Sequence, residues 1–341
     1  MHFSISSFYG KAKILLITKH ARVLDEIPRS HFVQLTCQTE APYTHRVVRI
    51  YQRKILAGLN ALVFLTLTIG ILIGVAAQPA GALTIIRQYI PPGEPFEFDG
   101  LQVAAGKAPA NTVGGGNLIE VFHAAADSWE RVIRDNHTLT IQFGWSPIPI
   151  GGGVHNIRYQ GGIPNRVMEA IVYFDNDGST MWFLDPTPRK HSEFPTLVEC
   201  YAGLGKGPIN SGRVLSNGLQ SGPTLDLLTI AKHEIGHALG LSTWNYQWVL
   251  KGAEKGIHLN APRPFAGTVL PVDTKGHLRL HGALMDQSLL PGQRKLISMV
   301  DLLAISEMGE FTDLNFNFEH LPNGDLELEN SKADSPCVPG L

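Results

Sequence analysis

The sequence has little charge of either sign, and the charge it has is nearly balanced. Only 17% of its 341 residues are charged, and 28 basic against 30 acidic residues leave a net charge of −2 at pH 7. Domains that bind nucleic acid usually carry a basic patch or stripe, so we expect no nucleic-acid partner. Hydrophobic residues make up 44% of the chain, which is enough for a packed core and argues against wholesale disorder.

Cysteine is scarce as well, with three residues in the chain. If the first 82 residues are removed on export, as the N-terminal pattern described below indicates, only Cys200 and Cys337 remain. An even pair in an exported protein is compatible with a disulfide, and two free thiols also fit the sequence.

Two common ligand-binding motifs are missing. The glycine triplets at 114–116 and 151–153 are not followed by Lys-Ser or Lys-Thr, so neither is a P-loop. The segment Asp175-Asn176-Asp177-Gly178 begins like a calcium-binding loop, but Pro186 stands where an EF-hand needs a glutamate. We expect a turn there. The isolated histidines are expected to be structural or superficial: His123, His137, His155 and His191.

The N-terminal part of the chain reads as a targeting region. Residues 1–54 are a basic extension, and a mis-assigned start codon would explain it. Arg49, Arg53 and Lys54 precede an uncharged run from Ile55 to Ala77, and small residues follow to Ala82. A basic segment, an apolar run and an A-x-A-like site predict a secretory signal over 55–82, hence an exported (secreted or periplasmic/extracellular) protein. The run is also long enough for an uncleaved membrane anchor, the only case in which we expect membrane contact.

The remaining residues predict an α+β fold, because helices and strands do not alternate regularly. We expect a helix that is capped by Asn117, with Glu120 as its capping-box partner, and that ends near Arg134. We expect a second helix that begins with a capping box of Ser298 and Asp301 and ends near Met308. The other expected parts are an irregular lead-in at 83–116, strands at 138–143, 170–174 and 181–184, loops at 144–153 and 185–223, a helix at 224–239, a catalytic domain over 117–310 and an acidic, partly loose tail at 311–341.

The segment from His233 to His237 has the pattern H-E-x-x-H and lies within the expected helix at 224–239. Residues four apart lie one turn apart on the same face of a helix, so both imidazoles can reach one metal ion. Glu234 can take a proton from water held by that ion. We expect Thr224 to be the N-cap of this helix and the negative charge of Asp226 to interact favourably with the helix dipole in the first turn. One face of the helix should be buried, and the two histidines should face a cleft.

A catalytic zinc site needs a third protein ligand, with the fourth position left to water. The extended metzincin pattern H-E-x-x-H-x-x-G-x-x-H matches as far as Gly240 but has Thr243 where the last histidine belongs. The downstream candidates are His258, His277, His281 and a carboxylate such as Glu307.

In the segment around His277, the chain most specifically resembles leishmanolysin-like metzincins and related bacterial secreted metallopeptidases. In that family a long insertion precedes the third histidine, a methionine turn follows, and a small apolar helix closes the domain. Ala283-Leu284-Met285 matches the turn, and the stretch from Ile297 to Gly309 matches the helix. The resemblance spans roughly 117–310 and implies a zincin-like catalytic domain with a small twisted sheet, His277 as third ligand, and Met285 beneath the ion.

These patterns predict a zinc-dependent endopeptidase acting on peptide or protein substrates. Zn²⁺ would bind His233, His237 and His277, and Glu234 would be the general base. Tyr246 and His281 are candidates for a second group that stabilises the oxyanion. The alternatives are a zinc-bound but non-catalytic exported binding or cell-surface module, and a membrane-anchored protein with a structural metal site; a structural site usually has four protein ligands.

Overall fold

The computed structural model describes residues 81–98, 101–148, 152–216, 224–317 and 327–330. The predicted extension at 1–54 and almost all of the predicted signal at 55–82 lie outside these ranges. Among the helices within the ranges, none combines the length and the apolarity needed to span a bilayer. Cys200 is buried and disulfide-bonded. Cys337 lies outside the described residues.

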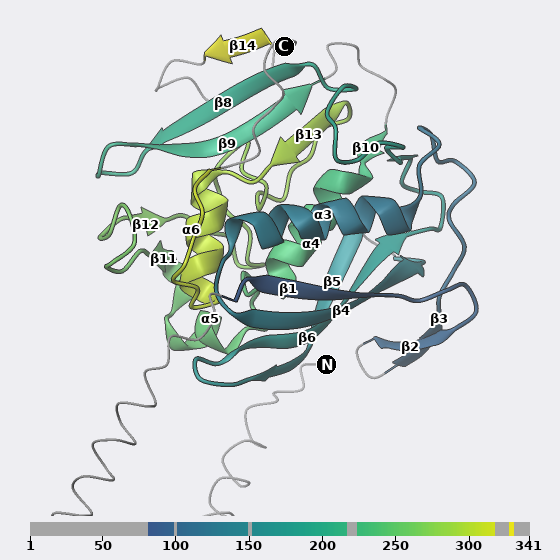
Figure 1. Cartoon of the computed structure of the whole chain (residues 1–341), viewed down its shortest axis with the longest axis horizontal. Coiled ribbons are helices and arrows are strands. Elements are labelled where there is room, and N and C mark those ends of the chain that lie inside the picture. The colour runs from purple at the N-terminus through teal and green to yellow at the C-terminus, as the bar shows by residue number, and fades with distance from the viewer. Residues whose placement is uncertain (1–80, 99–100, 149–151, 217–223, 318–326, 331–341) are drawn as a thin grey trace, which may run out of the picture. The chain divides into compact units, whose positions relative to one another are not determined.

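The described residues form a mixed α+β structure with few helices and small sheets (Figure 1). In chain order the elements are β1 (Leu83–Tyr89), β2 (Pro95–Phe98), β3 (Leu101–Ala104), α3 (Leu118–Val132), β4 (His137–Ser146), β5 (Gly153–Gly161), β6 (Arg166–Asp175), β7 (Trp182–Phe183), β8 (Thr196–Gly203), β9 (Pro208–Ser216), β10 (Leu225–Asp226), α4 (Leu227–Ala238), α5 (Tyr246–Leu250), the 3₁₀ turn η1 (Ala253–Lys255), β11 (Ile257–His258), β12 (Val269–Leu270), β13 (Gln293–Leu296), α6 (Met299–Met308) and β14 (Glu327–Asn330).

The main sheet has the strand order β1-β4-β6-β5. The first three of these strands are parallel, and β5 runs antiparallel to β6 at the edge. Phe143 at the centre of the sheet lies opposite Tyr89 on one side and Val172 on the other. Residues that lie opposite one another point to the same face, so this row contributes to a single core.

Helices α3 and α4 pack against each other and against this sheet. The alternating side chains Leu139, Ile141 and Phe143 of β4 lie in the same buried cluster as Phe122 and Trp129 of α3. The indole nitrogen of Trp129 also donates to the backbone carbonyl of Lys232 in α4 at 2.9 Å. This hydrogen bond fixes the position of α4 along α3 at Lys232, the residue before His233.

The segment at 83–116, predicted to be irregular, contains three strands. β1 continues the main sheet, with Leu83 and Ile85 buried in the helical core. β2 and β3 form a hairpin on the opposite face, where Phe96 stacks on Tyr173 at 4.0 Å between ring centroids. Period-2 alternation in Leu83–Tyr89 was the signal available for β1, and the surrounding glycines and prolines obscured it.

The segment at 185–223, also predicted to be loop, holds two long strands. β8 and β9 form an antiparallel pair that is the centre of a second sheet with the order β13-β9-β8-β14. Helix α6 packs against β9. In the predicted loop at 144–153, β4 extends to Ser146 and β5 begins at Gly153, while residues 149–151 lie outside the described ranges.

The N-cap of helix α4 is Asp226 rather than Thr224. The Asp226 side chain accepts the backbone N–H of Thr229 at 3.1 Å. It also receives both the Nε and an Nη of Arg294, at 2.9 and 2.8 Å, and the same guanidinium lies 2.8 Å from Asp185. Arg294 is 0% exposed, so this fully buried ion cluster ties the helix start to β13. Thr224 is not the cap because β10 runs through Leu225 and Asp226 before the helix starts.

The other two predicted caps form at the expected residues. Asn117 accepts the backbone N–H of Glu120 at 2.9 Å at the start of α3, but the predicted capping box is only half formed, because the Glu120 carboxylate lies beside Arg189 at 3.5 Å. Ser298 and Asp301 form a capping box at the start of α6. At the beginning of the tail, Asp135 accepts the backbone N–H groups of Thr312 and Asp313 at 2.9 and 2.8 Å. That part of the predicted loose tail is therefore held against the domain.

Candidate metal centre

Helix α4 carries His233 and His237 one turn apart. Their ring centroids are 4.6 Å apart, the planes are nearly perpendicular at 83°, and the two Nε2 atoms lie 3.0 Å from each other. The sequence predicted that the histidines would face a cleft from a half-exposed helix. His233 does line a cavity, but the helix is less exposed than predicted: every residue of α4 except Ile230 is buried, because the sheet, α3 and the 283–285 turn surround it.

The Nδ1 atoms of these rings are already engaged. His233 Nδ1 lies 2.8 Å from the carbonyl oxygen of Leu284, and His237 Nδ1 is hydrogen-bonded to the carbonyl oxygen of Leu241. A carbonyl oxygen only accepts, so each Nδ1 carries the proton. In a neutral imidazole the other nitrogen then holds a lone pair. Two such lone pairs 3.0 Å apart repel unless a cation lies between them.

Burial keeps both rings neutral. It lowers the pKa of His233 from 6.5 to about 4, although the neighbouring Glu234 carboxylate acts in the other direction. The pKa of His237 falls well below 6.5, mainly through burial and also through the charges of neighbouring histidines. Neutral imidazole is the form that binds a metal ion, so the surroundings select it before any ion arrives.

His277 reaches the same place from a turn far along the chain. Its ring centroid lies 5.3 Å from that of His233 and 5.0 Å from that of His237. One ligand atom of each of the three residues lies within 4.8 Å of the others, so together they can hold a metal ion. The structure thus brings together the three histidines that the sequence analysis assigned to zinc.

Asp273 orients His277. Its carboxylate lies 3.1 Å from His277 Nδ1 and accepts the backbone N–H groups of His277 and Lys275 at 2.9 and 2.8 Å. Burial opposes ionisation of Asp273, but these backbone N–H groups outweigh it and lower the pKa of the carboxyl group. An ionised Asp273 accepts from Nδ1, and the Nε2 of His277 is left to face the other two rings.

The other candidates for third ligand lie elsewhere. His281 is 78% exposed, with Asp286 its charged neighbour at 3.8 Å. His258 is exposed on β11. Glu307 is engaged with Lys251 at 3.1 Å and Arg263 at 2.9 Å. Tyr246, considered as an oxyanion donor, is 53% exposed on α5.

Met285 lies directly under the helix that carries the pair. A Cβ built on Gly236 would come within 2.4 Å of the Met285 sulfur, so the absence of a side chain at 236 lets the thioether pack against the helix between the two histidines. The backbone N–H of Met285 donates to Asp301 at 2.9 Å, and that of Leu284 donates to the same carboxylate at 3.0 Å. The capping aspartate of α6 therefore also holds the 283–285 turn.

Glu234 and two of the histidines open onto a cavity of about 280 Å³. Its wall also includes Gly152, Gly153, Asp286 and Lys295. A Cβ at Gly153 would lie 2.7 Å from the Ile230 side chain and 2.9 Å from that of Glu234, so a larger residue there would displace these side chains. The cavity therefore offers space for a ligand next to both a carboxylate and the imidazole cluster.

Scans against protein-family models, curated proteins and solved structures gave no match.

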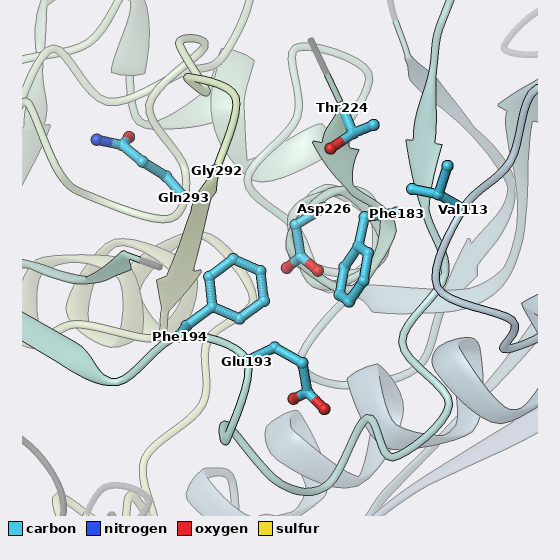
Figure 2. A pocket seen from close by; sticks show the side chains of 8 residues that line it. All are labelled: Val113, Phe183, Glu193, Phe194, Thr224, Asp226, Gly292 and Gln293. Atoms are coloured by element: carbon cyan, nitrogen blue, oxygen red, sulfur yellow. The ribbon is translucent and has the colours of Figure 1, made fainter. Parts of the chain in front are cut away.

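A second cavity, of about 230 Å³, lies at the start of α4 (Figure 2). The rings of Phe183 and Phe194 and the carboxylates of Glu193 and Asp226 line it. None of the three clustered histidines lines it, and the Asp226 carboxylate is already paired with Arg294. This cavity is therefore a poorer candidate for chemistry than the one at Glu234.

One further residue belongs to the site and has no marker in the sequence. His155, expected to be structural or superficial, stacks on His237 with 4.4 Å between ring centroids and lies 3.3 Å from a Glu234 oxygen. It stands 78 positions before His233, so no local spacing marks it. Only the pairing of β5 with β6 brings it to the helix.

Proposed function

We propose that this protein is an exported zinc-dependent endopeptidase with a zincin-like catalytic domain of the metzincin type. The observation that carries the proposal is the convergence of His233, His237 and His277, with the Nε2 atoms of the first two 3.0 Å apart and Glu234 adjoining them at a cavity. Three imidazoles with acceptors at Nδ1 are the donor set and supporting shell typical of catalytic zinc.

The three histidines fit zinc rather than a hard cation, because imidazole nitrogen suits Zn²⁺ while Mg²⁺ and Ca²⁺ prefer oxygen ligands. A bound zinc ion supplies Lewis-acid chemistry: it lowers the pKa of water and polarises a carbonyl group. Three protein ligands leave the position that substrate and water need.

Glu234 supplies the proton transfers. Its carboxylate takes a proton from the attacking water and then passes that proton to the leaving amine. The cavity gives the peptide a place to bind beside this carboxylate, and His233 and His277 lie in the same cavity wall. In this mechanism the histidines bind the metal ion and Glu234 transfers the proton, which accounts for the glutamate between the two histidines of the helix.

The resemblance to leishmanolysin-like metzincins supports the family assignment through two features. Met285 packs against α4 from the 283–285 turn, and α6 follows that turn and holds it through Asp301. Export rests on the basic and apolar pattern before residue 83, and N-terminal sequencing of the secreted protein should then begin just after Ala77 or Ala82.

The central test combines metal analysis with hydrolysis. The purified protein should contain about one zinc ion per chain and should cut casein at internal peptide bonds, as shown by mass spectrometry of the products. A chelator should abolish cleavage, and zinc should restore it. Zinc bound without any cleavage would instead support the non-catalytic exported module, and a protein without zinc affinity would contradict both functions.

A further inference from the structure

His155 reaches the candidate metal centre from the edge strand of the main sheet. It lies opposite Val172 in the β5–β6 register, and Val172 points into the core shared with the helices. Residues paired across strands share a face, so the His155 ring projects toward α4. There it contacts Glu234, His237 and Ser242.

The direction of each hydrogen bond follows from the partners. A carboxylate acting as a base is ionised and can only accept, so His155 Nδ1 donates to Glu234 Oε2 across 3.3 Å. In a neutral ring the Nε2 is then an acceptor, and the Ser242 hydroxyl, 2.8 Å away, donates to it. The Ser242 oxygen in turn accepts the backbone N–H of Trp244 at 3.2 Å. A chain of donors therefore runs from the turn after α4 to the carboxylate.

This chain has the composition of a Ser-His-acid triad but not its accessibility. Ser242 is buried and does not line the cavity at Glu234. A hydroxyl that no substrate reaches cannot serve as a nucleophile. Its effect is instead on the ring, since it fixes which nitrogen of His155 carries the proton.

We propose that His155 is a positioning residue for Glu234. By holding Oε2, it leaves Oε1, which lies beside Gly153 at the cavity wall, free for the proton of the attacking water. The same ring stacks on His237 with an interplanar angle of 19°, so base and ligand are held by one side chain. The proposal rests on the function proposed above, and its first test is independent of activity.

The first test measures the tautomer of His155 in the full chain by ring ¹⁵N chemical shifts, with and without zinc. The signals are assigned through their loss in His155→Asn. The proposal requires a protonated Nδ1 and an unprotonated Nε2. A ring protonated at Nε2 would overturn it, whether or not the protein hydrolyses peptides.

The second test separates the hydrogen bond from the stacked ring. His155→Asn keeps an N–H donor near the position of Nδ1 and loses the ring, whereas His155→Phe keeps the ring and loses both nitrogens. We expect His155→Phe to lower kcat about 10- to 100-fold with KM and zinc content unchanged, because a small misplacement of a catalytic group is costly. His155→Asn should recover most of that loss.

A double-mutant cycle with Glu234→Gln completes the design. If His155 acts through the carboxylate, His155→Phe should cause no further loss once Glu234 is glutamine. Full additivity, or equal losses in His155→Asn and His155→Phe accompanied by loss of zinc, would overturn the proposal and leave His155 as a brace for His237. Wild-type kcat in His155→Phe would contradict it while leaving the proposed function intact.

Discussion

The carboxylate of Asp301 accepts the backbone N–H of Met285 at 2.9 Å while also capping helix α6. One buried side chain thus receives four hydrogen bonds, from Leu284, Met285 and both the backbone and the hydroxyl group of Ser298. Burial raises the pKa of Asp301, so the hydrogen bonds must offset a cost in desolvation. The arrangement makes the turn under the metal centre dependent on α6.

We therefore expect Asp301→Asn to be strongly destabilising. Its amide nitrogen would face backbone N–H donors in place of an acceptor, and leaving such groups unsatisfied costs about 2–4 kcal/mol in total. Denaturant unfolding of the zinc-free protein measures the change. Asp313→Asn is the matched control, because Asp313 is exposed. Equal stability of the two variants would show that the Asp301 hydrogen bonds contribute little.

The role proposed for Glu234 predicts that its substitution affects hydrolysis but not zinc binding. Glu234→Gln keeps the size and shape of the side chain but cannot take up a proton, so kcat should fall about 10²- to 10⁴-fold. Zinc content should stay at the wild-type level, since the three histidines are unchanged. Near-normal hydrolysis by the zinc-loaded variant would contradict the proposed mechanism.

Two nearby histidines provide a matched pair for the third ligand. His277 lies with the α4 histidines, whereas His281 is 78% exposed four residues later. His277→Ala should weaken zinc binding by several orders of magnitude in a chelator competition, because two ligands hold the ion far less tightly than three. His281→Ala should bind zinc like the wild type. The reverse pattern would move the third ligand to His281.

Gly236→Ala sets two effects against each other. Alanine favours the helix over glycine by about 1 kcal/mol. The added methyl group would meet the Met285 sulfur at 2.4 Å, with Ile305 just beyond at 3.1 Å, and overpacking of this kind costs about 1–3 kcal/mol. We expect net destabilisation and reduced zinc affinity. Gly203→Ala has open space around it and serves as control in the same unfolding measurement.

The zinc-free protein should lose stability on mild acidification. The unfolded chain binds a proton at His233 near pH 6.5, whereas the folded site resists it until about pH 4. The contribution of neutral His233 to the free energy of unfolding is therefore fully present above pH 6.5 and is lost as the pH falls toward 4. At 1.36 kcal/mol per pKa unit, this loss amounts to about 3 kcal/mol. His233→Gln should show a flatter profile over that window. If the free energy of unfolding changed with pH in the same way in both proteins, His233 would not be the group responsible.

The helices were predictable because their signals are local. Asn117, Ser298 and Asp301 cap within one turn, and the H-E-x-x-H pattern fixes relative positions by helix geometry alone. The cap of α4 was misplaced by two residues since Thr224 and Asp226 are both good caps, and only the pairing of β10 with β7 decides between them. The prediction of His277 as third ligand rested on the family resemblance and the nearby methionine turn. Spacing alone did not distinguish it from the other downstream candidates.

The strands were harder because much of their pattern depends on tertiary contacts. β5 is an edge strand with few buried positions, so its sequence shows little alternation. His155 of β5 contacts α4 only because β5 pairs with β6. Gly212 lies inside β9, and the β8–β9 pairing has a register shift after Cys200, so this pair of long strands did not show as a hairpin in the sequence. Such pairings are non-local and leave no periodic signature.

β1 makes the main sheet depend on the residues that directly follow position 82. Leu83 and Ile85 are buried, and the strand pairs with β4 along its whole length. A processing enzyme that cut beyond residue 89 would remove this row of contacts and expose the backbone edge of β4. An open edge in a sheet invites pairing with another chain, so over-trimmed molecules should self-associate.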